Sequence, residues 1–176
     1  MDSEDINRVK AKLKEFIREI GGELLEEKDL EDRWGFVMKY GNYVVQIVHP
    51  KHLRFMVCVF SARFSPEVIN DVKELCKDPM KKVEFEFGLV SALTSPVTAY
   101  RHHFDDEGYV VGFEVIRKIF PFDESFTIRD FDEAIQSVVS IGVLGLRYLQ
   151  AVIGARKIEQ SISEWIGKPP PESMYI

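Results

Sequence analysis

The chain has 176 residues, of which 45% are hydrophobic and 30% charged, a composition that suits one globular domain with a substantial core. Lys and Arg number 23 against 29 Asp and Glu, a net charge of −6. This charge disfavours nucleic acid as the main partner, because phosphate binding needs a concentrated positive field. The acidic start of the sequence does not fit a signal peptide, and no uninterrupted apolar run approaches the roughly 20 residues of a membrane span. We therefore expect a cytoplasmic protein that binds neither nucleic acid nor a membrane.

The cysteines indicate the redox state of the protein's compartment, and the numbers of Asn and Gln indicate the growth temperature of its source. Cys58 and Cys76 fall in different predicted elements and lack the spacing of a metal site, so free thiols in a reducing cytoplasm are expected. Only three Asn and four Gln accompany many Lys and Glu, which favours a heat-adapted source.

The first third of the chain predicts a helix followed by a three-stranded antiparallel meander. Ser3 begins an amphipathic helix that Gly21-Gly22 ends, and an acidic connector at residues 26–32 leads to the first strand. Alternating side chains then predict strands at residues 33–40, 43–49 and 53–60.

The middle of the chain predicts two helices. Pro66 fits the first position of a helix that Asp78-Pro79 ends. The next segment is ambiguous, because residues 82–87 alternate like a strand. A helical stripe also fits it, formed by Met80, Val83, Phe87, Val90 and Leu93. We predict a helix to about Thr94, because the alternation is lost after residue 88.

A hairpin and a long helix complete the predicted domain. Strands at residues 97–104 and 109–120 flank an Asp-Asp-Glu-Gly turn, and a helix from Thr127 to about Gly154 follows. Apolar residues recur along this helix every three or four positions. Gly142 and Gly145 lower its helix propensity, which predicts a close approach by another backbone.

The apolar stripe changes phase after Gly154, so we expect the long helix to break there. Residues 1–154 are predicted to form a single α+β domain, with a terminal helix at residues 155–168 that packs on this domain or on a partner. Three consecutive prolines end that helix, and residues 169–176 are predicted to be a loose tail.

The sequence offers no convincing catalytic, cofactor or metal site. His49 and His52 flank a turn, and His102 and His103 are adjacent in a strand, so their side chains point to opposite faces and cannot chelate one ion. Surface histidines are the favoured interpretation. A zinc site that includes His49 and His52 is the less favoured alternative. In an apolar strand, Cys58 should be inert, and no phosphate-binding loop or serine elbow is present.

The second face of the predicted sheet is the most informative feature. If one face packs on the long helix, the other holds residues too apolar to face water: Val37, Val44, Val48, Met56, Cys58, Phe60 and Ile116. Two explanations remain open. The first or terminal helix of the same chain covers this face, or it binds a second subunit or a client polypeptide.

The order of elements resembles the small α+β fold of type III secretion chaperones and their chaperone-like relatives, which include uncharacterised archaeal proteins. The local likeness lies in residues 87–93, a helix, and residues 104–111, which form strand, turn and strand around Asp105-Asp106-Glu107-Gly108. The resemblance implies a homodimer that binds extended segments of other proteins without catalysis.

We therefore expect an α+β protein with an antiparallel sheet of about five strands packed on helices, a long C-terminal helix and no cofactor. The favoured function is a non-catalytic, chaperone-like module that binds another polypeptide on apolar surfaces, as a homodimer. The alternative is a small-molecule-binding protein or enzyme with a pocket between sheet and helices. Nucleic-acid binding is a third interpretation, which the charge disfavours.

Overall fold

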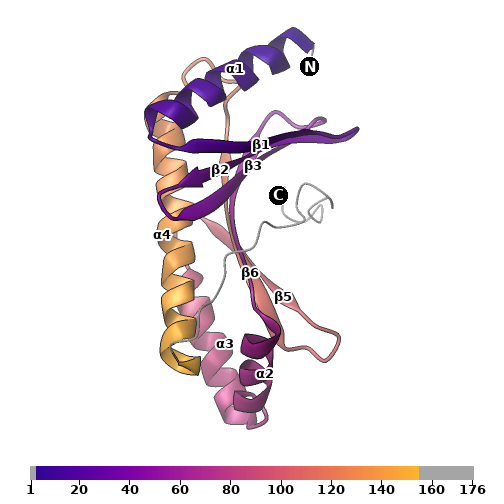
Figure 1. The fold of residues 1–176 in the computed structure, drawn as a ribbon, viewed down its shortest axis with the longest axis vertical. Helices are drawn as coiled ribbons and strands as arrows, with labels where there is room; N and C mark the ends of the chain where they lie inside the picture. The colour runs from indigo at the N-terminus through magenta and orange to yellow at the C-terminus, as the bar shows by residue number, and fades with distance from the viewer. Residues whose placement is uncertain (1–2, 155–176) are drawn as a thin grey trace.

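The computed structural model describes residues 3–154, which form a six-stranded antiparallel sheet with strand order β1-β2-β3-β4-β6-β5 and four helices (Figure 1). The strands are β1 Glu23–Asp29, β2 Arg33–Tyr40, β3 Tyr43–Pro50, β4 Met56–Arg63, β5 Ala99–Phe104 and β6 Val110–Ile119. The helices are α1 Ser3–Glu19, α2 Pro66–Leu75, α3 Pro79–Leu93 and α4 Ile128–Ile153. The predicted α+β class, with a long C-terminal helix, is confirmed. The strand count is one higher than expected.

The additional strand is β1, which replaces most of the predicted acidic connector. It pairs antiparallel with β2 at the edge of the sheet, and six of its seven residues are exposed. A charged edge strand carries no alternating apolar signal, and its charges discourage pairing with other chains. Lys10 on α1 holds it in place through Asp29 at 2.7 Å and Glu27 at 3.3 Å.

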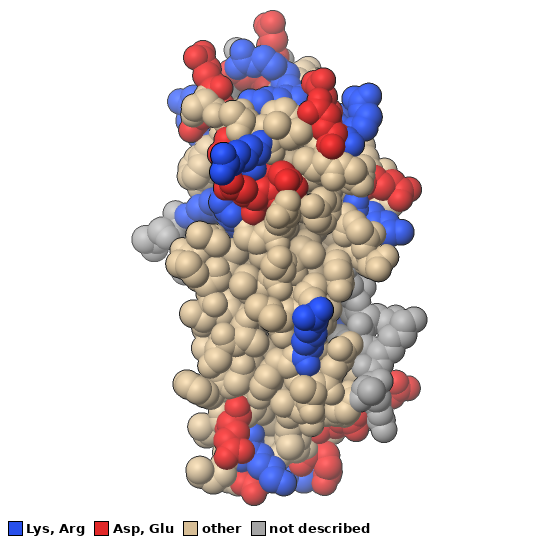
Figure 2. Space-filling model, turned by 90° about the vertical axis from the view of Figure 1, so that its left-hand side faces the viewer, with Lys and Arg blue, Asp and Glu red and all other residues tan. Residues whose placement is uncertain are grey.

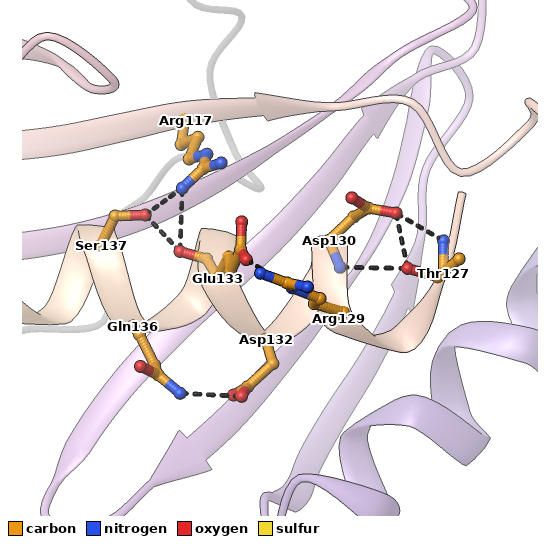
Figure 3. Close-up of polar contacts among 8 residues, drawn as sticks. All are labelled: Arg117, Thr127, Arg129, Asp130, Asp132, Glu133, Gln136 and Ser137. Atoms are coloured by element: carbon orange, nitrogen blue, oxygen red, sulfur yellow. Dashed lines mark hydrogen bonds and ion pairs between the residues drawn. The ribbon is translucent and has the colours of Figure 1, made fainter. Parts of the chain in front are cut away.

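Helix α4 begins at the predicted cap. The Asp130 backbone N–H donates to the Thr127 hydroxyl at 3.4 Å, and the Thr127 N–H donates to the Asp130 carboxylate at 2.7 Å (Figure 3). The two residues thereby satisfy N–H groups that a helix start leaves unpaired. The helix ends at Ile153, and Gly154 has a φ of 89°, so the predicted break is confirmed. The predicted terminal helix at 155–168 and the tail at 169–176 lie outside the described residues.

The two glycines of α4 allow close packing on the sheet. A Cβ atom at Gly142 would lie 2.3 Å from the Phe60 ring, and one at Gly145 would lie 2.7 Å from Leu93 and 2.8 Å from Phe113. The predicted close approach is therefore real, but side chains of β4, β6 and α3 make it rather than another backbone. These contacts place α4 directly over the centre of the sheet.

The main core lies between the sheet and the helices, and all four helices contribute to it. Its largest fully buried aromatic side chains are Trp34, Phe36, Phe60, Phe85, Phe113 and Phe131. The helix predicted after Pro79 is confirmed as α3, which buries Phe85, Leu89 and Leu93.

Candidate functional site

The face of the sheet opposite the helices, called here the second face, is apolar at its centre. Its buried cluster consists of Val37, Val48, Val57, Val59 and Ile116, with Val44 and Phe55 packed against it. No helix of residues 3–154 contributes to this cluster. The prediction that the sheet is apolar on both faces is therefore confirmed.

Three of the residues predicted for the second face lie elsewhere. Met56, Cys58 and Phe60 are fully buried in the main core beneath the helices. The strand register explains the difference: Cys58 pairs with Ile47, and directly paired residues point to the same face. The prediction began this strand at Leu53, whereas β4 begins at Met56. The face assigned from the meander was therefore wrong for β4, and its second-face residues are Val57 and Val59.

A buried ion pair lies beside the apolar cluster on the second face. The Glu114 side chain is 1% exposed and accepts a hydrogen bond from Arg101 Nη2 at 2.7 Å and one from Ser61 Oγ at 3.5 Å. His103 Nε2 lies 3.2 Å from the same carboxylate, without the alignment of a hydrogen bond. A buried carboxylate needs such partners. Glu114 is thus a structural group, held by a cation.

His49 is buried, so the prediction of a surface histidine is wrong for this residue. Its ring packs between Trp34 and Phe122, with ring centroids 5.2 and 4.9 Å away, and Nε2 lies 2.8 Å from the Leu53 carbonyl oxygen. Burial lowers the pKa of His49 and favours the neutral ring. His52 stays exposed on the turn. In residues 3–154, no group of three His, Cys, Asp or Glu is placed to hold a metal ion.

Both cysteines are free and buried. Burial raises the pKa of Cys58 to about 12 and also raises the pKa of Cys76. The thiolate is the nucleophilic form, so neither side chain is reactive at neutral pH. The predicted inertness of Cys58 has this physical basis.

The clearest apolar surface in contact with solvent lies on the helices. It is formed by side chains that are between 38% and 72% exposed: Met80, Val83, Phe87, Leu144 and Val152. We call this set the outer helix surface. Helices α3 and α4 lie side by side, joined by a hydrogen bond of 3.1 Å from Tyr148 to the Phe85 carbonyl oxygen.

Figure 2 shows the side of the molecule on which α4 lies. Uncharged side chains occupy most of the middle of this face, interrupted by one Lys or Arg, and the other charged side chains gather towards its two ends. The sequence of α4 agrees, because Arg147 is its only charged residue after Glu133. A broad uncharged face on a protein with 30% charged residues is unusual.

The sequence interpretation missed this surface for an identifiable reason. Met80, Val83 and Phe87 belong to the stripe that predicted α3, yet α3 buries a different set, Phe85 and Leu89 among them. The helix therefore carries apolar residues on two sides, and only one side packs on α4 and the core. The presence of a second apolar stripe in this helix was the sequence signal for an exposed apolar surface.

Helix α4 is long and apolar enough to cross a membrane by length and composition alone. The sequence interpretation, which looked for an uninterrupted apolar run, did not identify it. Nine residues of this helix are buried in the fold, and core helices of globular proteins also pass this test. Packing in the fold accounts for these nine residues, whereas Leu144 and Val152 are apolar and exposed.

Two charged residues that line a pocket near the start of α4, Arg117 and Asp130, serve the fold. A pocket of about 510 Å³ is bordered by Arg117, Asp123 and Asp130. Asp130 caps α4, and Arg117 donates to the Glu133 carbonyl oxygen at 2.9 Å and to Ser137 (Figure 3). Arg117 and Asp130 are both engaged by α4, so they do not form an acid–base pair that could act on a bound ligand.

Comparison with known proteins identifies the fold but no family. No family model matches the sequence, and no curated protein matches it. An uncharacterised protein from Methanothermobacter thermautotrophicus has a similar structure, with a TM-score of 0.72 and 17% identity over 83% of this chain and 99% of that one. YbjN from E. coli, a proposed transcription regulator, gives a TM-score of 0.45 with 10% identity over 78% of this chain and 88% of that one. The chain thus shares its fold with an archaeal protein.

Proposed function

We propose that the protein is a non-catalytic, chaperone-like module that binds another polypeptide through apolar surfaces, and that it forms a homodimer in the cytoplasm. The outer helix surface is the observation that carries this proposal. Its five apolar side chains are exposed on two adjacent helices, and exposed apolar groups that gather on a globular protein mark interaction sites. Burial of this surface by a second chain would remove Phe87, Leu144 and their neighbours from water, which favours association.

The state of the polar side chains supports a role without catalysis. Cys58 is a protonated, buried thiol, His49 is a neutral ring among aromatic side chains, and Glu114 is paired with Arg101. Burial, ring packing or an ion pair therefore explains the position of each of these groups without a catalytic role. Two free cysteines also fit a reducing compartment.

The second face remains part of the proposal only at its border, because the residues of its cluster are between 0% and 6% exposed. Of the residues assigned to it from the sequence, Val37, Val44, Val48 and Ile116 lie there. Met56, Cys58 and Phe60 leave the proposed contact set, because they pack beneath the helices. A partner on this face would contact the half-buried Val44 and Phe55 at its border.

Aspartate substitutions on the outer helix surface test the proposal. In sedimentation velocity, the full-length wild type should dimerise, while Leu144→Asp and Phe87→Asp should shift the chain to monomer, because each places a charge in the contact. Val97→Asp is the matched control, since Val97 is 54% exposed but lies outside this surface. A wild type that is monomeric at every concentration, or dimers that persist in both variants, would contradict the proposal.

A further inference from the structure

The outward side of α4 carries a regular seam of exposed residues. Its members recur at separations of three or four positions: Glu133, Gln136, Ser140, Leu144, Arg147 and Ala151. This is the spacing with which two helices pack side by side. The seam is distinct from the buried stripe of α4, which packs on the sheet and α3. It is therefore available to another helix.

The charges on the seam are arranged symmetrically about its centre. Glu133 and Arg147 are its only charged members, and they lie equally far along the helix from Ser140. Ser140 and Ala151 are small, which permits close approach of a second helix. Glu133 also pairs with Arg129 at 2.9 Å, but both side chains are at least half exposed, and such surface pairs are weak.

We propose that the occupant of the seam is a second copy of this chain, with the two α4 helices antiparallel across a two-fold axis at Ser140. The inference rests on the proposed function and names its partner. In this arrangement Arg147 of each copy faces Glu133 of the partner subunit, and Leu144 packs within the contact. A two-fold axis brings the same patch of both copies together, so that patch must be complementary to itself. Opposite charges placed symmetrically about Ser140 meet this requirement.

The opposite orientation is disfavoured by the same residues. Two parallel α4 helices in register would place Arg147 beside Arg147 of the partner subunit, and the two Glu133 side chains would also meet. Like charges in contact repel, and parallel helix dipoles add to that repulsion. Charge therefore selects the antiparallel dimer.

Charge reversal on the seam provides the test. Arg147→Glu and Glu133→Arg each place like charges across the proposed axis, so each full-length variant alone should show a dimer dissociation constant raised about tenfold or more. An equimolar mixture of the two variants restores opposite charges at both positions, and it should form a heterodimer with nearly wild-type affinity. Sedimentation velocity of the single variants and of the mixture measures this.

Two controls separate the seam from the fold and from the broader proposal. Arg8→Glu reverses an exposed charge on α1 and should leave the dimer unchanged, and circular dichroism should show that every variant is folded. If both single variants dimerise like the wild type, or if the mixture of the two variants forms no heterodimer, the antiparallel arrangement of the seam is wrong. In that case loss of the dimer in Leu144→Asp would still support the proposed function, whereas a monomeric wild type would overturn both.

Discussion

Glu114 is the residue at which the sheet carries a buried charge. Its carboxylate accepts from Arg101 at 2.7 Å and is almost completely removed from water. Removal of one partner from a buried ion pair leaves the other without compensation, which is strongly destabilising. We expect Glu114→Ala to lower the free energy of unfolding by about 3 kcal/mol, as measured by urea denaturation.

Glu74→Ala is the matched control for this substitution. Glu74 on α2 pairs with Lys77, which follows the helix, and both side chains are at least 69% exposed, so loss of Glu74 should change stability little. Equal effects of the two substitutions would show that Glu114 does not act as a buried, paired charge.

His49 should make stability depend on pH. Its pKa is lowered in the folded state by burial, so below about pH 6.5 the unfolded chain takes up a proton that the folded chain does not. Stability should therefore fall as the pH drops from 7.5 to 5.5, by at most about 1.4 kcal/mol per pH unit for this group. His102, whose pKa burial also lowers, acts in the same direction.

Urea denaturation of His49→Gln and His52→Gln at both pH values measures this contribution. The His49 variant should lose part of the pH dependence, whereas the variant at the exposed His52 should keep it. An unchanged pH dependence in His49→Gln would contradict the buried, neutral state of this ring.

At the scale of the element, α4 owes its position to its glycines. Alanine normally favours a helix over glycine by up to about 1 kcal/mol, but a Cβ at Gly142 would meet the Phe60 ring at 2.3 Å. Gly142→Ala should therefore destabilise the protein by about 1–3 kcal/mol, the usual range for overpacking. Ser140→Ala, on the exposed side of the same helix, should change stability by less than about 0.5 kcal/mol. Thermal unfolding followed by circular dichroism compares them, and a stabilised Gly142→Ala would contradict the close packing.

The elements themselves were predictable where one face is buried. The caps and apolar periods of α1 and α4 identified both helices, and the alternation of β2 and β3 identified the meander. Strand β1 was missed because its exposed, charged side chains carry no such period. The face of β4 was misassigned because it is apolar on both sides, so only its pairing with β3 fixes which residues, such as Cys58, point to the helices.

On the scale of the whole molecule, the sequence indicated the apolar second face but not the exposed apolar residues on the helices. Val37, Val48 and Ile116 do form a cluster on the second face. The outer helix surface emerges only when α3 and α4 are packed, since the tertiary arrangement decides that Phe87 faces solvent and Phe85 the core. The burial of His49 had a signal in the sequence, because His49 continues the inward alternation of Val45 and Ile47 in β3.

The distance between two copies of α4 tests the account most directly. A spin label at Gln136→Cys, in a chain whose own cysteines are buried, reports this distance by pulsed electron paramagnetic resonance. Two antiparallel helices that cross at Ser140 would hold the two residue-136 backbones about 15 Å apart. A label at Asp106→Cys, on the β5–β6 turn, should give a longer distance. Absence of coupling between copies at residue 136, or a distance no shorter than that at residue 106, would contradict the account.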